Sequence, residues 1–185
     1  MGVVAGQLAA LTVTVSSPDA RMRATVTAGK PRSFGFRPNT YRFYTEDRLG
    51  HQLARLATLA YIGHQRGVDR IHAENDMTVI RDPRQARDPA EATFVERSNS
   101  ITVAGVGARK MVRFKTTGML NWQCRIAEGT VRRLSEKEFV SEVSLAVNDV
   151  LGKTHSIAML LKDEYRGRVL SHDVRERLIA ELSAA

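Results

Sequence analysis

Basic side chains alternate with apolar ones along two stretches of this sequence, an arrangement suited to binding a polyanion. The stretch "ARMRATVTA" carries Arg21 and Arg23, and the stretch "KMVRFKTT" carries Arg113 and Lys115. Successive side chains of a β-strand point to opposite faces, so these cations share one face of each strand and the apolar residues share the other. Such a face can neutralise phosphates without reading the bases of a nucleic acid.

The positive charge of the chain is concentrated around these two stretches. From Arg21 to Arg42 there are six basic residues and no acid, and from Arg109 to Arg133 there are seven against Glu128 alone. A formal net charge of +8 favours anionic partners. The candidate DNA-contact residues are Arg21, Arg23, Lys30, Arg37, Arg42, Arg113, Lys115, Arg125, Arg132 and Arg133. A second interpretation stays open, in which they are ordinary solvated strand residues that discourage edge aggregation.

The same order of elements occurs twice in the chain, 90 residues apart. "TYRFYTEDRLGHQLARLA" begins at Thr40 and "TVRRLSEKEFVSEVSLAV" at Thr130, and without a gap Thr45 meets Ser135. In both copies a hydroxyl residue precedes acids and then apolar residues at helical spacing, which predicts a capped helix. Alternating segments that precede each helix predict strands over residues 11–17, 20–28 and 32–38, and over residues 100–106, 110–117 and 120–127. Each unit is therefore expected to be β-β-β-α.

The segment between the units reads as a linker. Two Arg-Asp-Pro triplets contain Pro83 and Pro89, and proline withholds a backbone donor and restricts the residue before it. Asp88 followed by Pro89 predicts the start of a short helix. We therefore expect a first unit over residues 1–76, a linker with a short helix over 77–98, and a second unit with a C-terminal helix over 99–185.

Signatures of other protein classes are missing from the sequence. It has no phosphate-binding loop, no Gly-x-Ser-x-Gly elbow and no histidine pair at helical spacing, so we expect no enzyme, no metal and no cofactor. The single cysteine, Cys124, falls on the apolar face of its strand and is expected to be a buried, inert thiol. No stretch approaches the roughly 18–20 apolar residues of a membrane span. A cytoplasmic protein of the nucleoid, with no membrane association, is the expectation.

Both units resemble a known family. Residues 42–49 (RFYTEDRL) and 132–139 (RRLSEKEF) share the pattern Arg-x-x-[Ser/Thr]-x-x-x-[Leu/Phe] at the start of a long helix, after a first strand such as "TVTV". This pattern is similar to that of the YbaB/EbfC family of small nucleoid-associated proteins, over residues 11–69 and 101–162. The resemblance implies homodimers that join their small sheets and bind DNA with little sequence preference. Relatives at type VII secretion loci imply an alternative, an accessory or chaperone-like protein without DNA binding.

The chain departs from that family in three ways. It carries two units where typical members have one. The helix that usually precedes the first strand is expected to be missing or vestigial at residues 1–10, whereas residues 88–98 supply it for the second unit. Gly105 and Gly107 are expected to loosen the first strand of the second unit.

The duplication has a physical interpretation. A unit of some 60 residues has a thin core and an exposed sheet edge. Joining two edges within one chain would give a larger continuous sheet with helices on one face. We therefore predict an α+β fold of two tandem β-β-β-α units, with antiparallel sheets, joined as an intramolecular pseudo-dimer. The alternative is two independent units on a linker. Double-stranded DNA is the expected partner, and a protein partner and a second copy of the chain are the alternatives.

Overall fold

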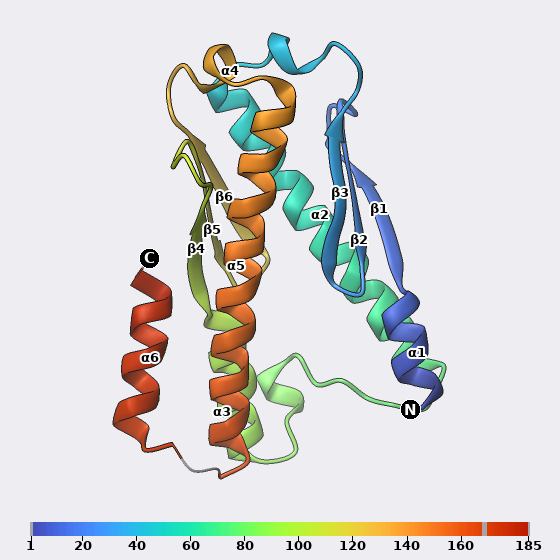
Figure 1. Cartoon of the computed structure of the whole chain (residues 1–185). Helices are drawn as coiled ribbons and strands as arrows, with labels where there is room; N and C mark the ends of the chain where they lie inside the picture. Colours follow the sequence, from blue (N-terminus) through green and yellow to red (C-terminus); the bar gives the residue numbers. More distant parts are fainter. Residues whose placement is uncertain (1, 168–169, 185) are drawn as a thin grey trace.

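The computed structural model describes residues 2–167 and 170–184 and shows an α+β fold (Figure 1). Its six strands are β1 (Thr12–Ser16), β2 (Met22–Thr27), β3 (Lys30–Phe36), β4 (Thr102–Val106), β5 (Val112–Thr117) and β6 (Asn121–Ile126). They form two antiparallel meanders of three strands each, sheet A in the order β1-β2-β3 and sheet B in the order β4-β5-β6. The expected order of strands in both units is confirmed.

Two of the helices, α2 and α5, are long, and each comes after the three strands of one sheet. The helices are α1 (Val3–Ala10), α2 (Glu46–Ala73), α3 (Pro89–Ser100), α4 (Thr130–Arg133), α5 (Glu136–Tyr165) and α6 (His172–Ala184), with 3-10 turns η1 (Tyr41–Phe43) and η2 (Pro83–Gln85). The caps are those that the sequence predicts. The Thr45 side chain accepts the Arg48 N–H at 3.4 Å, and Asp88 accepts the Glu91 N–H at 2.8 Å. Ser135 and Glu138 form a complete capping box at the start of α5.

Backbone turns recur at equivalent positions in the two units. Positive φ angles occur at four pairs of residues 90 apart: Ala20 and Lys110, Ala28 and Gly118, Gly29 and Met119, Asn39 and Gly129. The turn after the first strand is also held alike. The Asp19 N–H donates to Gln52 Oε1 at 3.3 Å, and the Arg109 N–H donates to Glu142 Oε1 at 3.0 Å. The two units therefore share one backbone design.

A helix was expected to be missing or vestigial before the first strand, and the structure has a short one of eight residues there, against twelve in α3. Helix α1 spans Val3–Ala10 and occupies the position equivalent to the last eight residues of α3. It packs on α2, as α3 packs on α5. Residues 3–10 carry no charged side chain, and Gly2, which precedes the helix, has no side chain that could cap it. Neither a capping residue nor charges at the ends therefore marked residues 3–10 as a helix.

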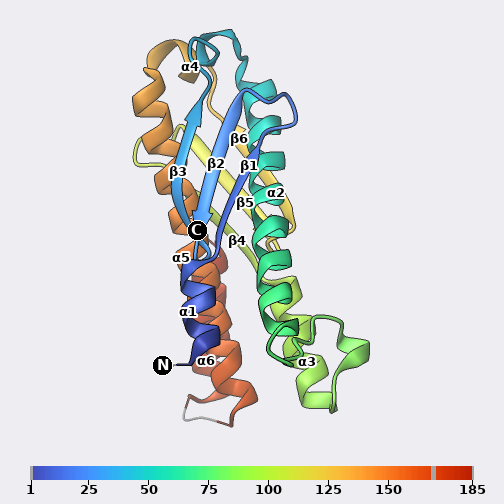
Figure 2. The same cartoon turned by 90° about the vertical axis from the view of Figure 1, so that its right-hand side faces the viewer.

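The two units share one core but do not share one sheet. Each long helix packs against the first strand of its own sheet and the third strand of the other: α2 against β1 and β6, and α5 against β4 and β3. Figures 1 and 2 show the sheets on opposite sides of the molecule, with α2 and α5 between them. The exchange of helix contacts is that of a pseudo-dimer. A larger continuous sheet was the wrong expectation, because the helices join the units instead of the strand edges.

Close approach of helix and strand explains two glycines. A Cβ at Gly50 of α2 would lie 2.7 Å from the Cys124 carbonyl oxygen, and a Cβ at Gly105 of β4 would overlap the Ala146 carbonyl oxygen of α5. The shared core then buries residues from both units, among them Met22 at 1 % exposure and Phe114 at 1 %. Gly105 was expected to loosen β4. It instead lets α5 lie directly on the strand.

Candidate nucleic-acid interface

Three of the candidate arginines lie together on the outward face of sheet A. The Arg37 N–H donates to the Arg21 carbonyl at 2.7 Å, which makes the two residues cross-strand neighbours. Arg23 lies two residues along β2 from Arg21 and stands opposite Gly35 of β3. Arg23 and Arg37 are exposed, and Arg21 is half-buried. Alternation has put these cations on one side of the sheet while Met22 and Phe36 enter the core on the other.

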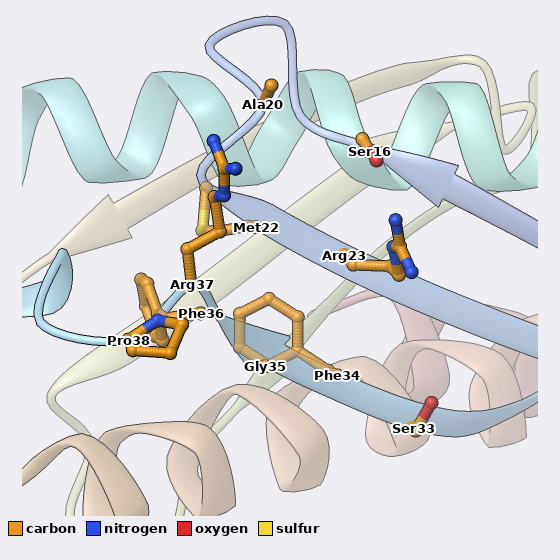
Figure 3. Close-up of a pocket in the computed structure, with 10 residues that line it drawn as sticks. All are labelled: Ser16, Ala20, Met22, Arg23, Ser33, Phe34, Gly35, Phe36, Arg37 and Pro38. Carbon is orange, nitrogen blue, oxygen red and sulfur yellow. The ribbon is translucent and has the colours of Figure 1, made fainter.

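An open groove of about 660 Å³ runs over this part of sheet A. Figure 3 shows the Arg23 and Arg37 side chains above the strands, with the Ser16 and Ser33 hydroxyls nearby. A Cβ at Gly35 would meet nothing within 4 Å, so the missing side chain leaves space between the two arginines. Guanidinium groups and hydroxyls around an open space suit a phosphate.

One carboxylate near this groove is held by its own neighbours. Asp19 accepts hydrogen bonds from the Tyr44 hydroxyl at 2.5 Å, the Ser17 hydroxyl at 2.7 Å and the Arg21 N–H at 3.2 Å. Partial burial would raise the pKa of Asp19, but these hydrogen bonds outweigh it and lower the pKa below its ordinary value. Asp19 is therefore an anion whose negative charge partly offsets the positive charge of Arg21. Arg23 and Arg37 have no such contact with Asp19.

Sheet B carries a second basic face. Arg113 pairs with Arg125 across β5 and β6, and Lys115 pairs with Gln123 in the next outward row. All three cations are exposed, whereas Val112 of the same strand is 0 % exposed. The alternation predicted from the sequence is therefore confirmed for this strand.

The remaining candidates lie outside the two faces. Lys30 begins β3 at the far end of sheet A from Arg37, where it pairs with Thr27. Arg42 lies in η1, and Arg132 and Arg133 lie in α4, and these two short elements contact each other at one end of the molecule (Figure 1). All four cations are exposed. The structure brings Arg42 together with the pair on α4 and leaves Lys30 apart.

The helix starts beside Arg42 and Arg132 already hold carboxylates of the chain. Glu46 lies in the first turn of α2 and accepts the Val131 N–H at 3.1 Å. Glu138 occupies the equivalent turn of α5 and accepts the Ser135 N–H at 2.9 Å. A phosphate at this end would meet the arginine side chains, because these carboxylates already occupy the positive ends of both helix dipoles.

The ten candidates make no ion pair with an acid in the described part of the chain, a property that they share with other exposed cations such as Arg66, Lys162 and Arg177. Within residues 2–167 and 170–184, the ion pairs with acids are made by Arg70, Arg81, Arg84, Arg87, Arg97, Arg109, Lys153, His172 and Arg175. None of the ten candidates belongs to this set. Their charge is therefore available to an external anion.

One expectation about the interface changes with the fold. In the larger continuous sheet that the sequence analysis expected, the cations of the two units could have formed one basic surface. The inner faces of both sheets enter the same core, so their outward faces point away from each other. Sequence reasoning also missed Gly35, Ser16 and Ser33. A glycine between two phenylalanines of a strand was the one available signal, since strand glycines often mark close approach.

Comparison with known proteins gives no further assignment. No protein-family model, no curated protein and no solved structure matches the chain. Within the part of the chain that the structure describes, no group of three or more His, Cys, Asp or Glu side chains could hold a metal ion. In that same part, none of the helices combines the length and hydropathy needed to cross a bilayer.

Proposed function

We propose that this protein binds duplex DNA with little sequence preference, through the outward faces of sheets A and B and the arginines of η1 and α4. The observation that carries the proposal is the gathering of three cations on the outward face of each sheet, none of them in an ion pair within the described residues. Cations on regular strands present charge at fixed spacing to phosphates. The sequence resemblance to the YbaB/EbfC family, and the nucleoid location that it implies, add to this proposal.

The side chains on these faces favour backbone contact over base reading. Sheet A offers Thr14, Thr25 and Ser33 in one outward row and Arg23 in the next. These hydroxyl side chains are short, and in the described structure neither outward sheet face carries a helix or a two-stranded ribbon that could enter a major groove. Binding of this kind depends mainly on charge and is expected to weaken steeply with salt.

Substitution of both faces tests the proposal. We expect Arg23, Arg37, Arg113 and Arg125, all changed to Ala, to weaken binding to a random duplex by at least about tenfold at low salt, because several phosphate contacts are lost. Fluorescence anisotropy measures the affinity. The control changes Arg66, Arg84, Lys162 and Arg177 to Ala, which removes the same formal charge from α2, η2, α5 and α6.

A single substitution tests the groove of sheet A separately. Gly35→Glu places a carboxylate between Arg23 and Arg37 without a clash, since the space beside Gly35 is open. Gly152→Glu adds the same charge on α5, where the space is also open. Of these two variants, only Gly35→Glu is expected to bind DNA more weakly than the unmodified chain.

Equal losses of affinity in the two quadruple variants would contradict the proposal, because only net charge would then matter.

The alternative function, a protein-interaction or accessory role, has one observation in its favour. A groove of about 540 Å³ lies between α5 and α6 and is lined by Met159, Leu160, Leu178 and Leu182. Met159 is 46 % exposed. An apolar groove between helices suits an amphipathic helix of another protein. Absence of DNA binding at low salt would favour this role.

A further inference from the structure

The free edge of β1 presents unused backbone hydrogen-bonding groups. The Ser17 N–H donates to the Met22 carbonyl and the Ala28 N–H donates to the Leu11 carbonyl, each at 2.9 Å. Odd-numbered residues of this segment therefore bond to β2. Even-numbered residues, which are Thr12, Thr14 and Ser16, direct their N–H and C=O groups outward. Across the described chain, no hydrogen bond reaches these outward backbone groups, and all three residues are exposed.

The equivalent edge of β4 is closed by the chain itself. Lys153 Nζ donates to the Ala104 carbonyl at 2.8 Å, and the Val106 N–H donates to Asp149 Oδ2 at 3.3 Å. The two α5 side chains also pair with each other at 3.1 Å. Helix α6 packs on β4 as well. Charged side chains on an edge are a common protection against pairing with another chain.

Helix α2 cannot protect β1 in the same way. The positions equivalent to Asp149 and Lys153 carry Leu59 and Gly63, which offer no polar side chain to the edge. Leu59 is 42 % exposed. A larger residue could not replace Gly63 without a clash, because its Cβ would lie 2.8 Å from Val13 Cγ1 of β1. Close packing of α2 here therefore leaves the β1 edge open.

The other two edges have protections of their own. Gly50 of α2 lies against the carbonyl of Cys124, one of the edge-facing residues of β6. Pro31 and a register shift interrupt β3, where Val26 pairs with Pro31 after Thr25 has paired with Ser33. Proline and bulges both discourage edge pairing. Of the four sheet edges described, β1 is the one without such a device.

We propose that β1 pairs antiparallel with β1 of a second copy of this chain. Residues 1–18 carry no charged side chain, in a chain whose formal net charge is +8. Two copies of a strongly basic protein can meet at an uncharged segment without like charges facing each other. Thr14 then faces its own copy, Thr12 faces Ser16 of the other copy, and about six backbone hydrogen bonds form.

This pairing joins two copies of sheet A into one six-stranded sheet. The Arg21, Arg23 and Arg37 side chains of both copies then lie on the same face of that sheet, since one continuous sheet has a common outward side. The pairing rests on the β1 edge alone and does not depend on DNA binding. Its test therefore contains no nucleic acid.

Disulfide trapping tests the register. Thr14→Cys places two thiols in a hydrogen-bonded pair whose Cα atoms lie about 5.5 Å apart, within the range that a disulfide spans. Oxidation is expected to give a covalent dimer at twice 20.6 kDa. Thr25→Cys is the control, because it has the same outward face on the central strand β2. Failure of Thr14→Cys to cross-link faster than Thr25→Cys would overturn the proposal.

The mass of the unmodified chain provides the second readout. Light scattering is expected to give a dimer for the unmodified chain and a monomer for Thr14→Pro, which removes an outward N–H and no bond to β2. Thr14→Lys is a second edge variant, and Thr25→Lys is its control. Circular dichroism checks that each variant is folded. A monomeric unmodified chain at all concentrations, or dimers of both folded edge variants, would contradict the pairing.

Discussion

At the scale of single residues, basic side chains divide by what they contact. Arg97 donates to both Glu164 and Glu176 at 2.5 Å and ties α3 to α5 and α6. Arg109 pairs with Glu138 at 2.9 Å and ties the turn between β4 and β5 to the first turn of α5. Arg23 and Arg37 have no such partner within the described residues. The first two arginines therefore hold elements of the fold together, and the second two are the ones that the proposed DNA binding would use.

The capping box of α5 should make stability depend on pH in the acid range. Hydrogen bonds from the Ser135 N–H and hydroxyl, and then from Arg109, lower the pKa of Glu138 from its ordinary value of 4.5 to about 2. Because the folded pKa is the lower one, this stabilisation is complete above about pH 4.5 and is lost as the pH falls toward 2.

Replacement of Glu138 isolates that contribution. We expect Glu138→Gln to show a shallower fall in the free energy of unfolding between pH 4.5 and 2 than the unmodified chain does, because the amide does not titrate. Urea denaturation at a series of pH values measures this. Glu96→Gln, on α3, is the control, because the Glu96 side chain makes no hydrogen bond to any residue that the structure describes. Parallel curves for Glu138→Gln and the unmodified chain would show that the carboxylate is not held.

At the scale of elements, the contact between α5 and β4 depends on a glycine. A methyl group at Gly105 would overlap the backbone of α5 at Ala146, and backbone cannot rotate away as a flexible side chain can. We expect Gly105→Ala to lower the free energy of unfolding by about 1–3 kcal/mol, the usual range for overpacking. Chemical denaturation is the measurement.

A matched glycine distinguishes packing from backbone preference. Gly35 also lies in a strand, but a Cβ there would meet open space. Gly35→Ala is expected to leave stability unchanged or slightly raised, because alanine loses less backbone entropy on folding. If both variants lose stability equally, close approach of α5 to β4 is not the reason for Gly105.

Strands, long helices and caps could be predicted from local pattern, and the partner of each element could not. Alternation of Arg113 and Phe114 fixes the faces of β5, and Thr45 and Ser135 mark the helix starts. The exchange of α2 onto β6 depends on contact between Gly50 and Cys124, which are far apart in the sequence. The outward position of Arg113 and Lys115 on β5 could therefore be predicted, while the division of the cations between two opposite sheet faces required the fold.

At the scale of the whole molecule, the shared core joins both units into one folding unit. Buried residues of both units belong to a single cluster, which includes Met22 of sheet A and Phe114 of sheet B. The alternative of two independent units on a linker does not fit this core. Loss of packing in one sheet must then destabilise the other.

The single tryptophan allows a test of this coupling. Trp122 reports on sheet B, and Met22 is 1 % exposed in sheet A. We expect Met22→Ala to lower the free energy of unfolding by about 2–5 kcal/mol. The unfolding midpoint should fall equally in Trp122 fluorescence and in far-UV circular dichroism. Met159→Ala, at a residue 46 % exposed, is the control. An unchanged fluorescence midpoint would mean that the sheets unfold separately.

The most direct test of DNA binding is a salt series, measured as fluorescence anisotropy on a random duplex of about 30 base pairs. We predict that the logarithm of the affinity falls linearly with the logarithm of the salt concentration, with a slope worth several phosphates at about 0.9 each. The variant with Arg23, Arg37, Arg113 and Arg125 changed to Ala should show a flatter slope. No binding even at low salt, or an unchanged slope in that variant, would contradict the account.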